Sequence, residues 1–180
     1  MSFKCLKDLL YVSSDIRTPQ AKEFLQDTKT LQLICNGITS IICPDLYDAG
    51  MNAVQALKSG VGLASHHDVL DEWESVWSGI SIISNRRTPM HRDWGGAFQF
   101  YDLLISGGTH TACVLDLPDL GAELQYLPGT AVAISGKVLR HGVKGWEGGE
   151  RVCAAHFMKD AVHDRLQQPR SDWPHLADYL

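Results

Sequence analysis

Hydrophobic and polar positions follow two different periods in this sequence, and the change comes near residue 80. In the stretch "PDLYDAGMNAVQALKSG", apolar residues recur at helical spacing, so that Ala49, Ala53 and Leu57 share one face. An aspartate near its start can cap this helix, and Gly60 is a natural stop. The segment "VLDEWESVWSGI" predicts a second helix, with its two tryptophans on one side.

The stretch "LQLICNGITSII" predicts a β-hairpin. Asn36 and Gly37 stand between two runs rich in apolar and β-branched residues. Asn-Gly is the dipeptide that two-residue hairpin turns prefer, because both central residues of such a turn need a positive φ. We therefore expect two N-terminal strands around this turn, in addition to the helices.

After Ser81 the pattern is that of short strands. Six apolar runs follow one another: "ISIIS", "FQFYDLLIS", "HTACVLDL", "AELQYL", "TAVAIS" and "ERVCAAHFM". Glycine and proline separate them at a spacing typical of an antiparallel barrel or sandwich. The final "KDAVHDRLQQP" predicts a helix that ends at Pro169. The expected fold class is α+β, with helices first, then a β-barrel core, then a closing helix.

Length and composition fit one domain with a proper core. The chain has 180 residues, of which 44% are hydrophobic and 21% charged, so disorder is not expected. No linker, internal repeat or low-complexity block divides the sequence. We expect a single domain over residues 1–180, with strands and support helices in 1–80, the barrel core in 81–160, and a helix with a polar tail in 161–180.

Charge and cysteine content narrow the function classes. The formal net charge of -5 argues against a protein that coats nucleic acid non-specifically, but it leaves a local basic groove open. The five cysteines form no C-x-x-C pair, which fits reduced thiols and offers no zinc-finger framework. Neither a secretory signal nor a membrane span is apparent, so we expect a nuclear or cytoplasmic protein with no membrane contact.

Three residues in the β-rich half form a candidate metal site. In "NRRTPMHRDWGG", His91 and Asp93 are two positions apart, so a strand or strand end can present both side chains on one face. His141, in "GKVLRHGVKGW", follows fifty positions later, after a β-run that would bring it back across the barrel. Two histidines and one carboxylate on one face of an ion leave three positions open, as in non-haem Fe(II) oxygenases.

A fourth residue, Arg151 in "GGERVCAAHF", indicates which molecule could occupy the open coordination positions of the ion. We expect its strand to pair with the strand that carries His141, through the glycine-rich "GWEGG" turn. A guanidinium there can hold a carboxylate by two parallel hydrogen bonds, as the distal end of 2-oxoglutarate requires. H-x-D, then His, then Arg is the order that such an oxygenase needs.

With these residues in view, the stretch from about Ser81 to Leu166 resembles the 2-oxoglutarate/Fe(II) dioxygenases, and within them the TET/JBP group that oxidises methylated DNA bases. The likeness is carried by "NRRTPMHRD", "LRHGV" and "ERVCAAHF" and by the spacings between them. It implies a double-stranded β-helix, a jelly-roll barrel, with supporting N-terminal helices. It also implies Fe(II), 2-oxoglutarate and dioxygen, and a methylated DNA base flipped out of the duplex.

The resemblance also implies roles for individual residues in the iron chemistry. His91, Asp93 and His141 correspond to the iron ligands. Arg151 corresponds to the salt-bridge partner of 2-oxoglutarate, and Arg86 to an arginine that contacts the same co-substrate.

The substrate side of the resemblance is less complete. Phe157 corresponds to an aromatic residue that stacks on the extruded base, and we expect Trp94 and Asn85 to contact the substrate, although ordinary packing fits Trp94 equally well. Some relatives have a histidine just past the stacking aromatic, where this chain has Lys159, and an acidic residue shortly after H-x-D, where it has Gly96 and a second glycine. The iron chemistry therefore transfers better than the identity of the base.

The expected function is oxidation of a methyl group on a DNA base, with 5-methylcytosine first, and no obligate protein partner. Basic residues flank the proposed iron site in sequence and could contact phosphates: Arg86, Arg87, Arg92, Lys137, Arg140 and Lys144. One alternative is demethylation of N6-methyladenine, with release of formaldehyde. A second is an oxygenase acting on a protein or a small molecule, and a third is a catalytically silent binding barrel.

Overall fold

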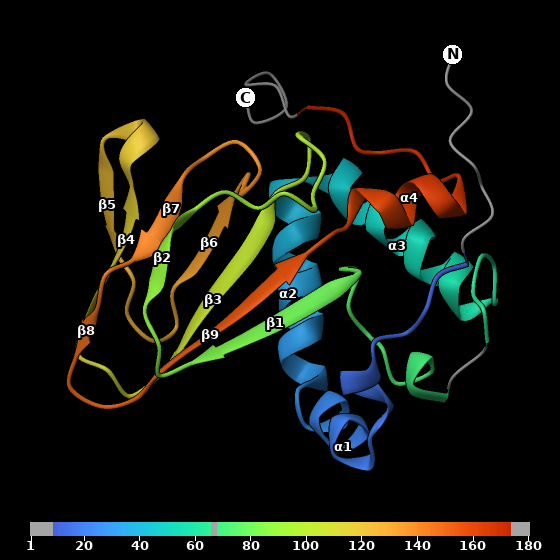
Figure 1. Ribbon diagram of the computed structural model, residues 1–180, viewed down its shortest axis with the longest axis horizontal. Coiled ribbons are helices and arrows are strands. Elements are labelled where there is room, and N and C mark those ends of the chain that lie inside the picture. Colours follow the sequence, from blue (N-terminus) through green and yellow to red (C-terminus); the bar gives the residue numbers. More distant parts are fainter. Residues whose placement is uncertain (1–8, 66–67, 174–180) are drawn as a thin grey trace. The chain divides into compact units, whose positions relative to one another are not determined.

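The computed structural model describes residues 9–65 and 68–173 and forms two compact units (Figure 1). One unit comprises residues 1–78 with 160–180, and the other comprises residues 79–159. The named strands lie in the second unit and the α-helices in the first. The α+β class is confirmed by this order of elements.

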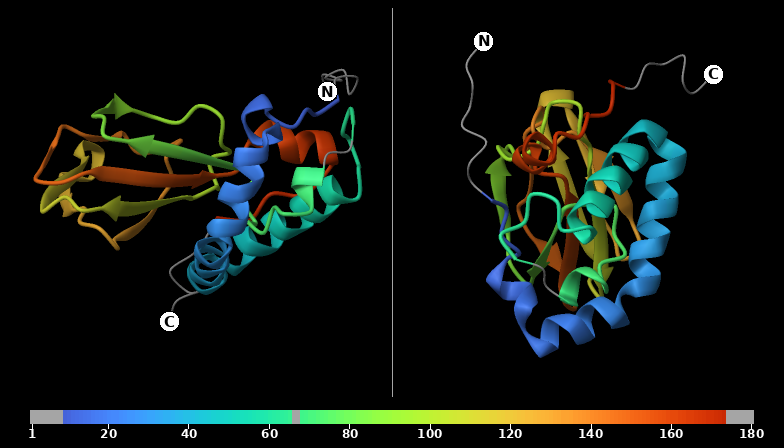
Figure 2. Two further views of the ribbon diagram at one scale, coloured as in Figure 1. Left: turned by 90° about the horizontal axis from the view of Figure 1, so that it is seen from below. Right: turned by 90° about the vertical axis from the view of Figure 1, so that its right-hand side faces the viewer.

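The β-rich unit consists of two antiparallel sheets, which the left view of Figure 2 shows from below. The first sheet has the order β1-β9-β3-β6, with β1 at Gly79–Ser84, β9 at Arg151–Phe157, β3 at Asp102–Gly108 and β6 at Ala131–Ile134. The second sheet has the order β2-β7-β4-β5, with β2 at Thr88–His91, β7 at His141–Val143, β4 at Ala112–Leu117 and β5 at Ala122–Gln125; β8, at Trp146–Glu147, also pairs with β4. This arrangement confirms the predicted jelly-roll core.

The core of this unit follows from alternation along its strands. In β4, Cys113, Leu115 and Leu117 are buried, while the positions between them are exposed or half-buried. Such residues from both sheets form one cluster: Leu104, Cys113, Leu115, Leu117, Tyr126, Ile134, Val143 and Cys153. Each of the six apolar runs seen in the sequence overlaps one strand, namely β1, β3, β4, β5, β6 or β9. A two-layer sheet buries one face of each strand, and this produces such runs.

One expected strand pairing is wrong. β9, which carries Arg151, pairs with β1 and β3, whereas β7, which carries His141, pairs with β2 and β4. Gly148 and Gly149 have positive φ values of 62° and 47°, and they turn the chain from one sheet to the other. A side chain at Gly149 would overlap the Thr109 backbone, so the turn is as tight as glycine allows. Arg151 and His141 therefore belong to opposite sheets.

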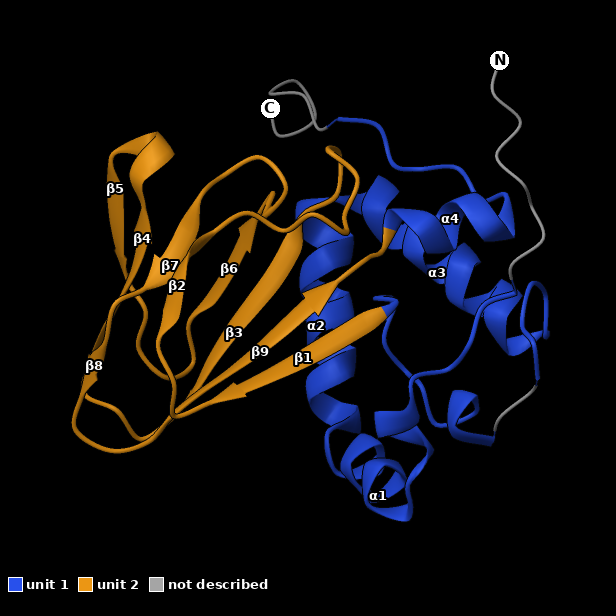
Figure 3. Cartoon of the chain, in the orientation of Figure 1, with its two compact units in different colours: residues 1–78, 160–180 blue, residues 79–159 orange. Residues whose placement is uncertain are grey.

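The helical unit is drawn in blue in Figure 3. Its elements are η1 at Ser14–Arg17, α1 at Pro19–Asp27, α2 at Lys29–Ile42, α3 at Pro44–Lys58, η2 at Asp68–Leu70 and α4 at Asp160–Leu166. The predicted helices at α3 and α4 are confirmed. Among the described residues, none of the helices combines the length and apolar character that a membrane span requires.

The predicted hairpin and the predicted second helix are both wrong, and the same contacts explain both. Asn36 lies inside α2, where its side chain accepts from the Val76 N–H at 3.0 Å and donates to the Glu74 carbonyl at 2.7 Å. Those backbone groups would otherwise serve a helix across residues 71–78, and here only the short η2 forms. Trp73 and Trp77 are buried at helical spacing without a helix, so their pattern reflects burial alone.

Candidate functional site

The two histidines of the candidate metal site meet across a strand pair. β2 and β7 run antiparallel, and the ladder places His91 directly opposite His141. Side chains at opposite positions of such a pair share one face, and the two ring centroids are 4.3 Å apart. The register shifts between Thr88 and His91, an irregularity of the kind that aims side chains next to active sites.

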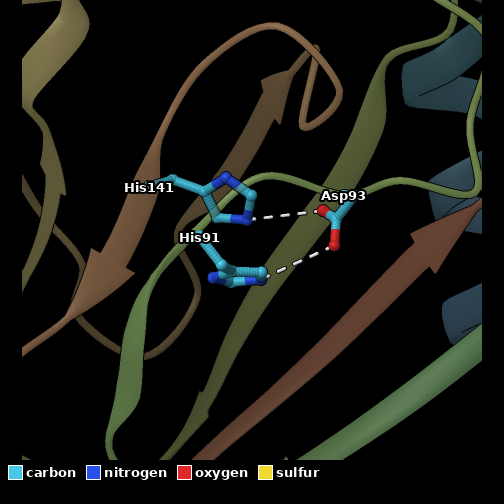
Figure 4. A group of neighbouring side chains, drawn as sticks. All are labelled: His91, Asp93 and His141. Atoms are coloured by element: carbon cyan, nitrogen blue, oxygen red, sulfur yellow. Dashed lines mark ion pairs between the residues drawn. The ribbon is translucent and has the colours of Figure 1, made fainter.

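Asp93 completes the group, as Figure 4 shows. Its Oδ1 lies 3.5 Å from His91 Nε2, and its Oδ2 lies 3.4 Å from His141 Nε2. The backbone N–H of Asp93 donates to the Gly136 carbonyl at 2.8 Å, which fixes the chain just past the end of β2. One ligand atom from each of the three residues lies within 4.8 Å of the others. Ligands at about 2.1 Å from an ion lie roughly 3 Å apart, so the donors need only a small adjustment to close on one ion.

The histidine hydrogen bonds favour the tautomer that a metal needs. His91 Nδ1 lies 2.8 Å from the Pro89 carbonyl, and His141 Nδ1 lies 3.1 Å from the Leu139 carbonyl. Because a carbonyl only accepts, each Nδ1 carries the proton and each Nε2 presents a lone pair toward Asp93. Burial lowers the pKa of His141 below its usual value, which keeps the imidazole neutral and able to bind a metal.

A second carboxylate lies beside the group and was missed in the sequence. Asp102, at the start of β3, is buried, and burial first, with the charge of Asp93 second, raises its pKa to about 7. The Gly136 N–H donates to Asp102 and opposes this rise. A Cβ at Gly136 would overlap Asp102 and lie 2.5 Å from Asp93 Oδ2, so only glycine fits between the two acids. An acid in the otherwise apolar run "DLLIS" was the available signal.

Arg151 has the features of an anion-binding residue. Its side chain is 1% exposed, yet its Nε has no hydrogen-bond partner in the described part of the chain. One terminal nitrogen donates to the Arg86 carbonyl at 2.9 Å. A buried guanidinium nitrogen without a partner costs free energy, so a ligand carboxylate is the natural partner for it.

A single cavity of about 390 Å³ joins these groups. It is lined by the three candidate metal ligands and by residues of both sheets, among them Arg86, Thr88, Asp102, Leu104, Leu115, Tyr126, Arg151, Cys153 and Phe157. Its volume lies within the range of small-molecule sites. Two nitrogen donors, one carboxylate and a buried arginine in one cavity fit Fe(II) together with a keto acid that carries a second carboxylate.

The three predicted substrate residues lie in different surroundings. Phe157 lines the cavity at the end of β9. Trp94 is 83% exposed, and its neighbours Gly95 and Gly96 line the cavity. Asn85 exchanges hydrogen bonds with the backbone of Arg151: its N–H donates to the Arg151 carbonyl, and its side-chain oxygen accepts from the Arg151 N–H. Its contact with substrate stays a prediction.

Three of the six basic residues that flank the site in sequence are paired with acids. Arg92 and Arg140 both bind Asp119 at 2.8 Å, and Lys144 binds Asp116 at 2.9 Å. Lys137 instead donates to the Trp94 carbonyl at 2.9 Å. Their charges are therefore less available to phosphates than the sequence alone indicates.

Comparison with known proteins agrees with this geometry. The profile of the Tet/JBP family, described as the oxygenase domain of the 2OGFeDO superfamily, matches residues 3–160. A solved structure of NgTET1 in complex with 5mC DNA is similar in fold, with a TM-score of 0.64 at 13% identity, over 94% of this chain and 61% of that chain. This chain thus spans slightly less than two thirds of the NgTET1 chain, and no curated protein matches it. The chain belongs to the Tet/JBP family and is an oxygenase domain that uses Fe(II), 2-oxoglutarate and dioxygen.

Proposed function

We propose that this chain oxidises the methyl group of a methylated base in DNA, with 5-methylcytosine as the first candidate. The observation that carries the proposal is the joint presence, in one cavity, of the His91, Asp93 and His141 donors and the buried, unpaired Nε of Arg151. Family membership supports the reaction class, and the likeness to NgTET1, described with 5mC DNA, motivates the substrate.

The chain's own residues have separable tasks in this reaction. His91, Asp93 and His141 hold the ion on one face and leave the other positions to small molecules. When bound, Fe(II) with 2-oxoglutarate and dioxygen supplies the oxidation, in which one oxygen atom goes to the substrate methyl group and the other to succinate, with loss of carbon dioxide. Arg151 binds the distal carboxylate of the co-substrate, and Arg86 assists from the same wall.

A DNA base is supported by aromatic residues at and near the cavity. Phe157 offers a ring face inside the cavity on which a flipped base can stack. Outside it, Trp94 and Phe98 are 83% and 59% exposed, and Lys137 Nζ lies 5.6 Å and 5.5 Å from their ring centroids. Exposed aromatic rings next to a cation are typical of surfaces that contact unpaired bases. If DNA is the substrate, the nucleus is the expected compartment, and no protein partner is needed for the reaction.

N6-methyladenine is the second candidate base. Gly95 and Gly96 line the cavity without side chains, and a Cβ at Gly95 would have nothing within 4 Å. Lys159 Nζ lies 5.9 Å from the centre of the Phe157 ring, where it can contact a base or a phosphate. This open and basic rim leaves room for a purine.

The metal site is tested by anaerobic addition of Fe(II) and 2-oxoglutarate to the purified chain. We expect a visible charge-transfer band in the wild type that is lost in His91→Ala and Asp93→Ala. Arg87→Ala serves as the control, because Arg87 is exposed and does not line the cavity. A band that persists in both ligand variants would overturn the assignment.

The substrate is tested by succinate formation with duplexes that carry 5-methylcytosine, N6-methyladenine or no methyl group. A retained oxidised cytosine supports the first base, and release of formaldehyde supports the second. Iron-dependent succinate that no duplex stimulates would favour a protein or small-molecule substrate. No iron-dependent succinate under any condition would favour a non-catalytic binding barrel.

A further inference from the structure

One carboxylate outside the cavity ties together the two chain segments that carry the metal ligands. Asp119 lies in η3, Pro118–Leu120, between β4 and β5. Its Oδ2 accepts from Arg92 Nη2 at 2.8 Å and from the backbone N–H of Arg140 at 2.8 Å. Its Oδ1 accepts from Arg140 Nε, also at 2.8 Å. Three hydrogen bonds from two distant segments thus end on one side chain.

Both arginines that bind Asp119 are neighbours in sequence of candidate metal ligands. Arg92 stands between His91 and Asp93, and Arg140 immediately precedes His141. Arg92 Nε also donates to the Val138 carbonyl at 2.8 Å, which adds a direct link between the two segments. Each donor group is therefore at most one residue away from a candidate ligand, although Asp119 itself does not line the cavity.

The strands that carry the ligands need such support. β2 has four residues and β7 has three, and their ladder has two paired positions, with an irregularity between them. So short a ladder opposes small rotations of either segment only weakly. A metal site loses affinity when its ligands must be brought together on binding. A contact outside the site that already holds the ligand segments in place therefore raises the metal affinity.

We propose that Asp119 is a positioning residue for the metal centre, which holds the His91–Asp93 and His141 segments at the spacing that one ion requires. This inference rests on the proposed metal site. The charge state suits the role: hydrogen bonds from Arg140, and then the charges of both arginines, lower the pKa of Asp119 to about 2, so it is ionised at any working pH. Because both arginines bind Asp119, they are less available to contact DNA phosphates.

The inference is tested with Asp119→Asn and a matched control, Asp116→Asn. Asp116 lies on β4 of the same hairpin, with its backbone opposite Gly142, and its side chain binds Lys144 at 2.9 Å, just past the end of β7. Its carboxylate binds neither Arg92 nor Arg140, so it does not link the two ligand segments to each other. We expect Asp119→Asn to weaken Mn(II) binding by about tenfold, as measured by calorimetry on the metal-free protein. The control should bind Mn(II) as the wild type does, and the metal-free Asp119→Asn should keep its melting temperature within a few degrees.

The outcomes separate the two proposals. If the wild type binds no Mn(II), the metal site itself fails, and the inference fails with it. If the wild type binds but Asp119→Asn binds equally well, or if both variants weaken equally, the positioning role is overturned while the metal site stands. Should Asp119→Asn not fold, the double variant Arg92→Ala with Arg140→Ala gives the answer: it removes both side-chain donors to Asp119 and keeps every candidate ligand, and unchanged Mn(II) binding would overturn the inference.

Discussion

At the scale of single residues, Asp102 makes the stability of the metal-free protein depend on pH. Burial and the charge of Asp93 raise its pKa to about 7 in the folded chain, against roughly 3.9 in an unfolded chain. Between these values the folded state holds a proton that the unfolded state has lost. The stability that Asp102 contributes to the folded state is therefore fully present below the pKa of the unfolded chain, and it is lost as the pH rises through the pKa of the folded chain.

Asp102→Asn removes this titration and keeps an oxygen for the Gly136 N–H. We expect the difference in the free energy of unfolding, variant minus wild type, to increase with pH. The increase should be on the order of 3 kcal/mol between about pH 4 and pH 8. Urea denaturation of both metal-free proteins across this range measures the difference. Parallel pH profiles for the two proteins would contradict the expectation.

At the scale of elements, the pairing of β1 with β9 sets the place of Phe157, the residue proposed to stack on the base. Gly79 lies opposite Phe157 in this ladder, and a Cβ at Gly79 would overlap the Phe157 ring. The ring therefore lies over the glycine, and its position in the cavity depends on the missing side chain. Gly107, on β3, also faces β9, opposite Val152, but a Cβ there would meet nothing within 4 Å.

Gly79→Ala should displace the Phe157 ring without touching the metal ligands. We expect the KM for methylated DNA to rise about tenfold, with an unchanged Fe(II)/2-oxoglutarate band. Gly107→Ala is the control and should leave both quantities unchanged. A loss of the band in Gly79→Ala would mean that β1 supports the metal site as well, and an unchanged KM would remove Phe157 from the substrate contacts.

Prediction of elements from the sequence succeeded where one face of the element is buried in the usual way. The alternation in β4 and the apolar face of α3 each predict the correct element from the residues of that element alone. The Asn36-Gly37 turn failed because the Asn36 side chain binds the backbone at Glu74 and Val76. A remote hydrogen bond of this kind overrides a local preference and leaves no periodic trace in the sequence.

At the scale of the whole molecule, charge limits how the proposed DNA substrate could bind. The chain carries a net charge of -5, and Arg92, Arg140 and Lys144 are already paired with acids. Half of the six basic residues that flank the site are therefore less available to replace the counterions of a duplex. Binding should depend more on the exposed rings and on the extruded base than on phosphate contacts.

The affinity for a methylated duplex should accordingly fall only gently with salt. We expect the slope of log K against log salt to be smaller in magnitude than about 4, where many phosphate contacts would give about 6 to 10. Lys137→Ala should reduce the magnitude by about 1, whereas Lys144→Ala should leave it unchanged, because Lys144 is already paired with Asp116. A steep slope in the wild type would show that the paired arginines reach phosphates after all.

The sequence by itself determined the donors and their order: an H-x-D, a later histidine and a later arginine on short strands. These follow from local information, because residue type sets the ligand chemistry and a period of two sets the face of a strand. Only the tertiary structure decided that Arg151 comes from the sheet opposite His141, and that Asp102, Gly136 and Asp119 surround the site. The physical reason is that strand pairing and hydrogen bonds between distant segments depend on how the whole chain packs, which no local pattern encodes.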